Sequence, residues 1–288
     1  MSTRWIWLGA AIMVVSQAAT FAQIEPFWSW NTPIAWTGFI IFADAIVARA
    51  RGGSWLRSAP HEFIGLALAS IPLWLVFEGY NLVIRNWNYT GLPENALLRN
   101  FGYAWSFATI WPAMFEGAEL VAVWRGAAPL KRRPTNDGPT YEGVGRRFSG
   151  AELLSVAAGA AMLASPFLAS PTTARYLAAP VWLGFIFLLE PINARLGNES
   201  LWDDGRARRP DRMINLALSG VLCGVLWEFW NYWSRAKWHY TVPIMEELKI
   251  FEMPLPGYFG FPAFALECFT MYVFVRRAVT RGGRAIAL

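Results

Sequence analysis

Charged residues are scarce in this 288-residue chain, of which Asp, Glu, Lys and Arg together make up 16%. Soluble domains carry about a quarter charged residues, and their surface helices need a polar face toward water. Hydrophobic residues make up 55% of the chain. They are clustered in runs of about 20, each long enough to cross a hydrocarbon core of ~30 Å. The composition therefore excludes a soluble helical protein and predicts a protein of the membrane.

Cysteine and histidine are also scarce, with two residues of each. Cys223 and Cys268 lie inside apolar runs, where cysteine usually serves as a small packing residue, and they form no zinc-type spacing. His61 and His239 fall at opposite ends of their runs, so they cannot ligate one haem from both sides. No nucleotide-binding loop or catalytic triad is visible. The sequence predicts no metal and no cofactor, and it favours free cysteines.

Eight apolar segments are expected to cross the membrane. All should be helices, because lipid-exposed backbone must satisfy its hydrogen bonds within one segment. The segments are 5–22, 32–48, 62–84, 102–123, 151–169, 177–194, 213–234 and 257–275. The predicted fold class is therefore all-α, a polytopic membrane helical bundle.

The basic residues predict an orientation for these segments. With the N-terminus inside, 19 of the 25 Lys and Arg residues fall on the inner side of the membrane and 6 on the outer side. The positive-inside rule then places both termini in the cytoplasm and the protein in the cytoplasmic membrane. The net charge of +5 needs no nucleic-acid partner, since the same basic loops can contact anionic membrane lipids.

An internal repeat runs through the chain. The stretch WTGFIIFADAIVAR (36–49) aligns with WLGFIFLLEPINAR (182–195), with seven of fourteen positions identical, and WNYT (87–90) matches WHYT (238–241). Repeated hydrophobicity alone would not keep these residue types in order. We interpret the pattern as a tandem duplication into a first repeat, a linker and a second repeat: 1–124, 125–149 and 150–288.

Each repeat is expected to contain four helices. An even number of spans returns the chain to the same side of the membrane, so the two repeats share one orientation. They should be related by a pseudo-two-fold axis along the membrane normal, as in other parallel-repeat membrane proteins. The linker 125–149 has the Pro, Gly and charge content of a cytoplasmic connection.

Four glutamates interrupt the apolar runs at matched positions. They are Glu78, Glu116, Glu228 and Glu267. Counting residues to the nearest span boundary at 1.5 Å per residue places all of them near the middle of the membrane. Intramembrane acids are expensive and are functional candidates by default, and a carboxylic acid kept neutral can donate a proton. We predict them as the catalytic residues, with hydrogen bonding between helices as the structural alternative.

Polar and aromatic neighbours complete the predicted site. Asn81 and Asn231 follow their glutamates by three residues, so each shares a helix face with a carboxyl that it can orient. Aromatic faces beside an acid can line a pocket for a flat, polyene-like ligand or stabilise a carbocation. The predicted ligand-binding residues are Asn81, Asn231, Tyr80, Trp111, Trp227 and Trp230. Many other aromatic residues near span ends are typical of interfacial belts.

A second pair of matched acids lies near the inner ends of the spans. Asp44 and Glu190 each precede an arginine by five residues, Arg49 and Arg195 respectively. We expect these acids to pair with those arginines, which is a structural role.

The segment KWHYTVPIMEELKIFEMPLPGYFGFPAF (237–264) resembles the membrane lycopene cyclase domain of carotenoid synthesis. The resemblance is carried by Trp238, Tyr240, Pro254, Phe259 and Phe261. It implies a small duplicated helical unit that needs no metal and starts ring closure by protonation from a carboxylic acid. The two acids that follow the family's proline are replaced by Leu255 and Pro256, so an acid role would pass to Glu228 or Glu267.

Several functions stay open at this point. The leading hypothesis is a protein that binds or converts a lipid-soluble isoprenoid or carotenoid-like molecule, with a cofactor-free cyclase or isomerase as its enzymatic form. A proton-coupled transporter also fits duplicated helices with buried carboxylates. A di-iron site is disfavoured, because asparagine is a much poorer iron ligand than histidine. The last alternative is an accessory or scaffold subunit that holds partner membrane subunits.

Overall fold

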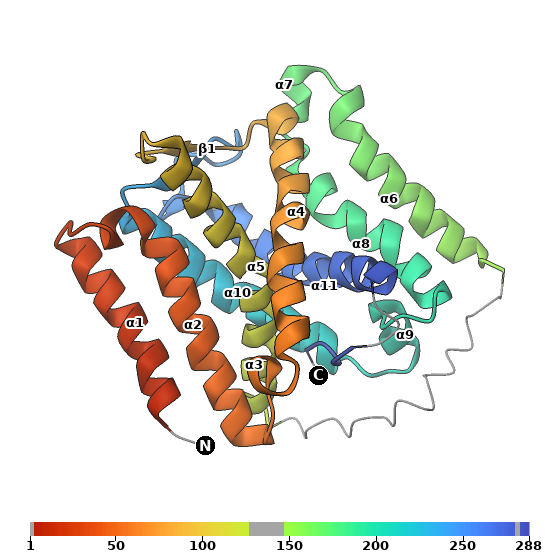
Figure 1. The fold of residues 1–288 in the computed structure, drawn as a ribbon. Helices are drawn as coiled ribbons and strands as arrows, with labels where there is room; N and C mark the ends of the chain where they lie inside the picture. Colours follow the sequence, from red (N-terminus) through yellow and green to blue (C-terminus); the bar gives the residue numbers. More distant parts are fainter. Residues whose placement is uncertain (1–2, 127–146, 280–282, 288) are drawn as a thin grey trace.

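Helices dominate the computed structural model, which describes residues 3–126, 147–279 and 283–287 (Figure 1). Each of the eight segments predicted to be helical coincides, to within a few residues, with one long helix. These are α1 (Arg4–Phe21), α2 (Phe27–Arg51), α4 (Pro60–Ile84), α5 (Ala96–Trp124), α6 (Gly150–Leu168), α8 (Ala178–Arg195), α10 (Asp211–Trp233) and α11 (Gly260–Val279). The prediction of a helical protein is confirmed.

Membrane-crossing character is found in five helical segments within the described residues, judged by length and composition: α2, α4, α6, α10 and Leu255–Ala278. The last of these joins the 3-10 turn η1 (Leu255–Phe259) to most of α11. The architecture is that of a helical membrane protein. Short helices occupy the connections: α3 (Trp55–Ser58), α7 (Pro171–Ala174) and α9 (Leu201–Arg206).

Most of the predicted linker 125–149 lies outside the described residues. So do several of the basic residues that entered the charge count, namely Lys131, Arg132, Arg133, Arg146 and Arg281. Below, residues 3–126 are called the N-terminal half and residues 147–287 the C-terminal half.

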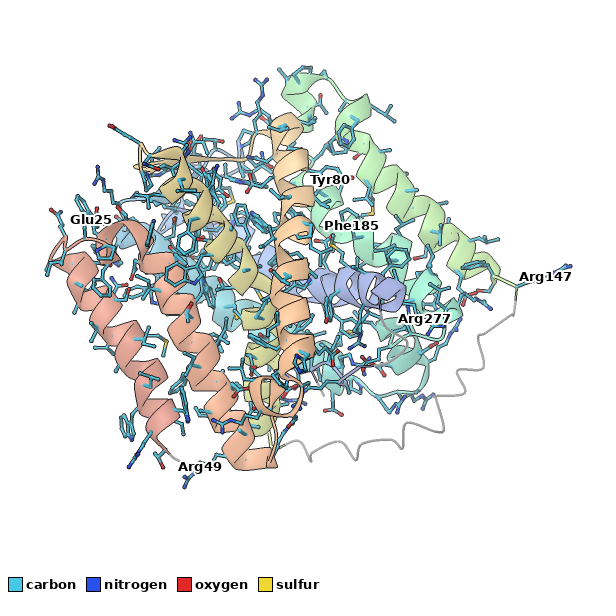
Figure 2. The ribbon with its side chains drawn as sticks, in the orientation of Figure 1. Glu25, Arg49, Tyr80, Arg147, Phe185 and Arg277 are labelled. Atoms are coloured by element: carbon cyan, nitrogen blue, oxygen red, sulfur yellow. The ribbon has the colours of Figure 1, made fainter. Side chains whose placement is uncertain are left out.

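The two termini lie at the same end of the bundle, and β1 (Trp87–Thr90) and α7 lie at the opposite end (Figure 1). We call these the terminal end and the strand end. Arg49 marks the terminal end and Glu25 the strand end (Figure 2). The last described residues fold back onto the bundle, where Arg284 binds both carboxyl oxygens of Glu119 at 2.7 and 3.1 Å and Ile286 is fully buried.

Glycines let two pairs of helices approach closely. A Cβ on Gly9 of α1 would stand 2.5 Å from the backbone nitrogen of Phe42 in α2. A Cβ on Gly159 of α6 would stand 2.3 Å from the backbone nitrogen of Leu188 in α8. Such distances exclude any side chain, so these glycines fix the contact of α1 with α2 and of α6 with α8.

Helix starts follow from local sequence. The Asn95 side chain accepts from the backbone N–H groups of Leu97 and Leu98 and begins α5. Ser149 and Glu152 form a reciprocal capping box that begins α6. These caps satisfy N–H groups that the first turn of a helix leaves without an internal partner.

The described residues contain two short antiparallel strand pairs. One joins β1 to β2 (Lys237–Tyr240), strands that lie about half the chain apart. The other joins β3 (Lys249–Ile250) to β4 (Met253–Pro254) as a hairpin ahead of η1. The β1–β2 pair joins the N-terminal half to the C-terminal half at the strand end.

Candidate functional site

The duplicated motifs WNYT and WHYT pair with each other. In the β1–β2 register Trp87 faces Tyr240, Tyr89 faces Trp238, and Asn88 faces His239. Each tryptophan of one motif therefore lies opposite the tyrosine of the other. Directly opposite aromatic side chains on one face of an antiparallel pair contact each other and stabilise it.

Glu78 of α4 holds the aromatic residues of its own half in place. Its Oε1 atom accepts hydrogen bonds from Tyr89 Oη at 2.6 Å, Trp74 Nε1 at 2.8 Å and Trp87 Nε1 at 3.3 Å. Three donors converge on one carboxyl oxygen. The acid thereby joins α4 to β1 and fixes the orientation of three rings.

Glu228 of α10 makes the corresponding contact in the C-terminal half. Its Oε1 accepts from Tyr240 Oη at 3.1 Å, and Trp238 Nε1 donates to the same hydroxyl at 3.0 Å. Burial, and then the neighbouring glutamate, raise the pKa of Tyr89 and of Tyr240. Both phenols therefore stay protonated and keep donating to the carboxyl groups.

Asn81 and Asn231 close the turn between helix and strand in each half. Asn81 donates to the carbonyl of Trp87 at 2.8 Å and accepts from its N–H at 3.2 Å. Asn231 does the same with Trp238, at 2.9 and 3.0 Å. The amides thus bind the strand backbone. That the two amides also orient the glutamates or bind a ligand stays a prediction.

A cavity of about 440 Å³ lies below the β1–β2 pair, between the two halves. Its volume falls in the usual range for small-molecule sites, about 300–1,000 Å³. We call it the aromatic cavity after the residues that dominate its walls: Trp36, Trp74, Trp87, Tyr89, Tyr103, Phe107, Trp182, Trp227, Trp238, Tyr240 and Phe264.

The aromatic walls pack against one another across the two halves. The ring centroids of Trp74 and Trp227 are 5.6 Å apart, and those of Trp74 and Phe264 are 5.9 Å apart. Trp227 also lies 5.1 Å from Trp238. These separations are typical of tilted and edge-to-face aromatic pairs. Aromatic rings from both halves therefore line the cavity on several sides.

The rim of the cavity is formed by the β3–β4 hairpin and η1. Met253, Pro256 and Phe259 line it, and Phe259 is 83% exposed. Glu252 fastens the hairpin to β2, with its carboxyl 3.1 Å from Lys237 Nζ and 2.9 Å from His239 Nδ1. Burial alone would raise the pKa of Glu252, but the hydrogen bonds and charges of these two partners outweigh it, so the pKa is lowered.

Replacing Glu252 with glutamine is expected to reduce the acid sensitivity of the fold. Because the pKa is lowered on folding, ionised Glu252 stabilises the protein above its usual pKa of 4.5, and this contribution is lost as pH falls through the folded pKa. A partly exposed ion pair contributes up to about 1 kcal/mol. Thermal unfolding in detergent between about pH 7 and about pH 3 measures the effect. Parallel curves for wild type and variant would contradict it.

Of the aromatic residues predicted to bind a ligand, Trp227 lines the aromatic cavity. Tyr80 instead lies on the α6 side of α4, where its hydroxyl donates to the Leu163 carbonyl at 3.1 Å (Figure 2). Trp111 is fully buried and donates to the Cys268 carbonyl at 2.8 Å. Trp230 packs edge-on against Trp36 at 4.8 Å. These three contacts are structural.

The four glutamates do not gather into one centre. Glu78 and Glu228 bind the strand tyrosines, whereas Glu116 and Glu267 are fully buried in α5 and α11 with no hydrogen-bond partner for either carboxyl oxygen among the described residues. None of the four lines the aromatic cavity as the described residues form it. Counting residues along one helix gives depth but not the face on which each acid lies.

The acids near the terminal end make hydrogen bonds and an ion pair with neighbouring segments. Asp44 accepts from the backbone N–H of Leu56 at 2.9 Å and lies 3.4 Å from Arg57 Nε. Glu190 accepts from the hydroxyls of Ser200 at 2.9 Å and Thr270 at 2.7 Å. These donors come from the connecting loops and from α11, and the contacts fit the structural role expected for both acids.

The metal-binding alternative receives no support from the described residues, which contain no group of three His, Cys, Asp or Glu side chains placed to hold an ion. Cys223 and Cys268 are both free and buried, which confirms their prediction as packing residues.

The residues that sequence reasoning missed are the strand tyrosines and tryptophans. The duplication of WNYT as WHYT is the signal for them, but aromatic residues near span ends also fit an interfacial belt.

Comparison of the chain with protein-family models, with curated proteins and with solved structures gives no significant match. The function must therefore be argued from the site itself.

Proposed function

We propose that this protein binds a lipid-soluble, isoprenoid-like molecule in the aromatic cavity, between two tandem membrane repeats. The cavity itself carries the proposal, since a volume of about 440 Å³ is enclosed by ring faces from both halves. Flat unsaturated chains pack well against such faces, because offset and edge-on aromatic contacts add to the burial of apolar area.

Matched geometry in the two halves supports the repeat. Helix α1 packs on α2 as α6 packs on α8, and α4 packs on α5 as α10 packs on α11. The β1–β2 register places Asn88 opposite His239, its counterpart in the alignment, as a two-fold axis through that pair requires. The hydrogen bonds of Glu78 and Asn81 recur at Glu228 and Asn231.

In the proposed topology the chain crosses the cytoplasmic membrane eight times, and both termini lie in the cytoplasm. Placing the termini at one end and β1 at the other, as Figure 1 does, agrees with an even number of crossings. The charge split of 19 to 6 assigns the terminal end to the inside. The aromatic cavity would then open toward the outer leaflet.

Binding, rather than acid-catalysed conversion, is the function proposed. A general acid must lie within hydrogen-bond reach of the atom that it protonates. Glu78 and Glu228 accept hydrogen bonds from tyrosines that line the cavity but do not line it themselves among the described residues. Glu116 and Glu267 are not part of this lining either. The carboxyl groups therefore act on the walls of the cavity, by holding their rings in place.

The proposal predicts that an apolar compound co-purifies with the protein. Membranes of an isoprenoid-producing host would be solubilised in mild detergent, and the purified protein would be extracted with organic solvent for mass spectrometry. An unsaturated isoprenoid should be enriched over the host lipid extract at a near-stoichiometric ratio. Another membrane protein purified in parallel controls for bulk carry-over. An extract with the same composition as the bulk lipid would contradict the proposal.

A further inference from the structure

One face of α5 lines the aromatic cavity from the strand end inward. The residues on this face recur every three to four positions, as one side of a helix requires: Arg99, Gly102, Tyr103, Ser106, Phe107 and Ile110. Arg99 lies near the start of α5, which begins at the strand end (Figure 1). Ile110 lies about 16 Å further along the helix. The face therefore changes from a cation, through polar groups, to apolar side chains as the cavity deepens.

Arg99 has guanidinium donors that are both free and accessible. Its Nη1 donates only to backbone carbonyls, those of Pro93 and Glu94, both at 3.4 Å. Nε and Nη2 have no hydrogen-bond partner in the part of the chain that the structure describes, and neither atom is enclosed by protein. The residue as a whole is half-buried. A group that enters the cavity at the strand end can therefore reach these two donors.

The charged residues that line the aromatic cavity are all of one sign. They are Arg99 and Lys237, and no Asp or Glu lines the cavity as the described residues form it. Lys237 is ion-paired with Glu252 at 3.1 Å. Arg99, in contrast, has no acid partner among the described residues. The strand end of the cavity thus carries one uncompensated positive charge beside apolar walls, which attracts anions and repels cations.

We propose that the ligand of the aromatic cavity is an amphiphilic acid, with a carboxylate or phosphate bound by Arg99 and its isoprenoid-like chain among the aromatic rings. Nε and Nη2 form one edge of the guanidinium and present two parallel N–H groups, which match two oxygens of either anion. The α5 face then follows the ligand from headgroup to chain. The inference rests on the proposed binding function and narrows its ligand class.

All-trans-retinoic acid and all-trans-retinol share one polyene chain and differ in the group at its end. Each would be titrated into the purified protein in non-ionic detergent at about pH 8, where a carboxylic acid is ionised, with quenching of tryptophan fluorescence as the readout. Arg99→Gln should weaken the binding of retinoic acid about tenfold and leave retinol binding unchanged. Arg99→Lys should weaken it less, because the charge stays while the paired donors are lost.

Arg85→Gln is the matched control, because Arg85 is an exposed arginine at the strand end of α4 that does not line the cavity. It should bind both probes as the wild type does. Farnesyl phosphate and farnesol, each used to displace bound retinol, repeat the comparison for a phosphate. If Arg99→Gln binds both acids as tightly as the wild type, while retinol still binds, the inference is wrong and the proposed function stands. If no probe binds to the wild type, both are wrong.

Discussion

Replacing Ala263 with phenylalanine is expected to abolish ligand binding while the bundle stays folded. Ala263 lies in the first turn of α11 and lines the aromatic cavity. A phenyl ring there fills space that the ligand needs, and the cavity can take the ring without pushing helices apart. All-trans-retinol, an unsaturated isoprenoid, serves as the probe, and its binding is measured by the quenching of tryptophan fluorescence. Its affinity should fall by at least about a hundredfold, or about 2.7 kcal/mol.

The matched control lies on the same helix. Ala278 is exposed at the far end of α11, so Ala278→Phe adds the same ring away from the cavity. This variant should bind retinol as the wild type does. Thermal unfolding of the two variants checks that any difference comes from the cavity and not from loss of fold. If Ala263→Phe binds retinol with wild-type affinity, the aromatic cavity is not the site.

Replacing Asn231 with leucine is expected to destabilise the fold strongly. Asn231 is fully buried, and its amide satisfies both the N–H and the carbonyl of Trp238. Leucine would leave both backbone groups unpaired, at a cost of about 2–4 kcal/mol. Thermal unfolding in detergent measures this loss. Retinol binding should weaken too, because Trp238 forms part of the cavity wall.

Two further variants sharpen this prediction. Asn81→Leu makes the same change in the N-terminal half, where the amide also accepts from Asn86, and it should destabilise to a similar degree. Asn88→Leu is the control, since Asn88 is an exposed residue of β1. Its replacement should shift the unfolding temperature little. If Asn231→Leu unfolds at the same temperature as Asn88→Leu, the bracing role of the asparagines is wrong.

The helices could be predicted from sequence because each depends on local information. Long apolar runs with few charges define where a helix must lie. A single segment in lipid can satisfy its backbone hydrogen bonds only as a helix. Span ends shift by a few residues because α2 and α5 extend past their apolar runs.

The site could be predicted only in part, because it depends on contacts between distant segments. The matched Glu–Asn pairs are visible in FEGYN and WEFWN, but their partners come from strands whose pairing joins Trp87 to Tyr240. No local pattern predicts that register. Likewise, the number of aromatic residues does not predict which of them line the cavity. Trp227 does, whereas Trp111 donates to the Cys268 carbonyl. Those faces are set by how α5, α10 and α11 pack.

The most direct test of the account is an experimental structure of the protein with all-trans-retinol bound. We expect density for the polyene inside the aromatic cavity. Density for retinol confined to the outer, lipid-facing surface of the helices, with the aromatic cavity unoccupied, would contradict it.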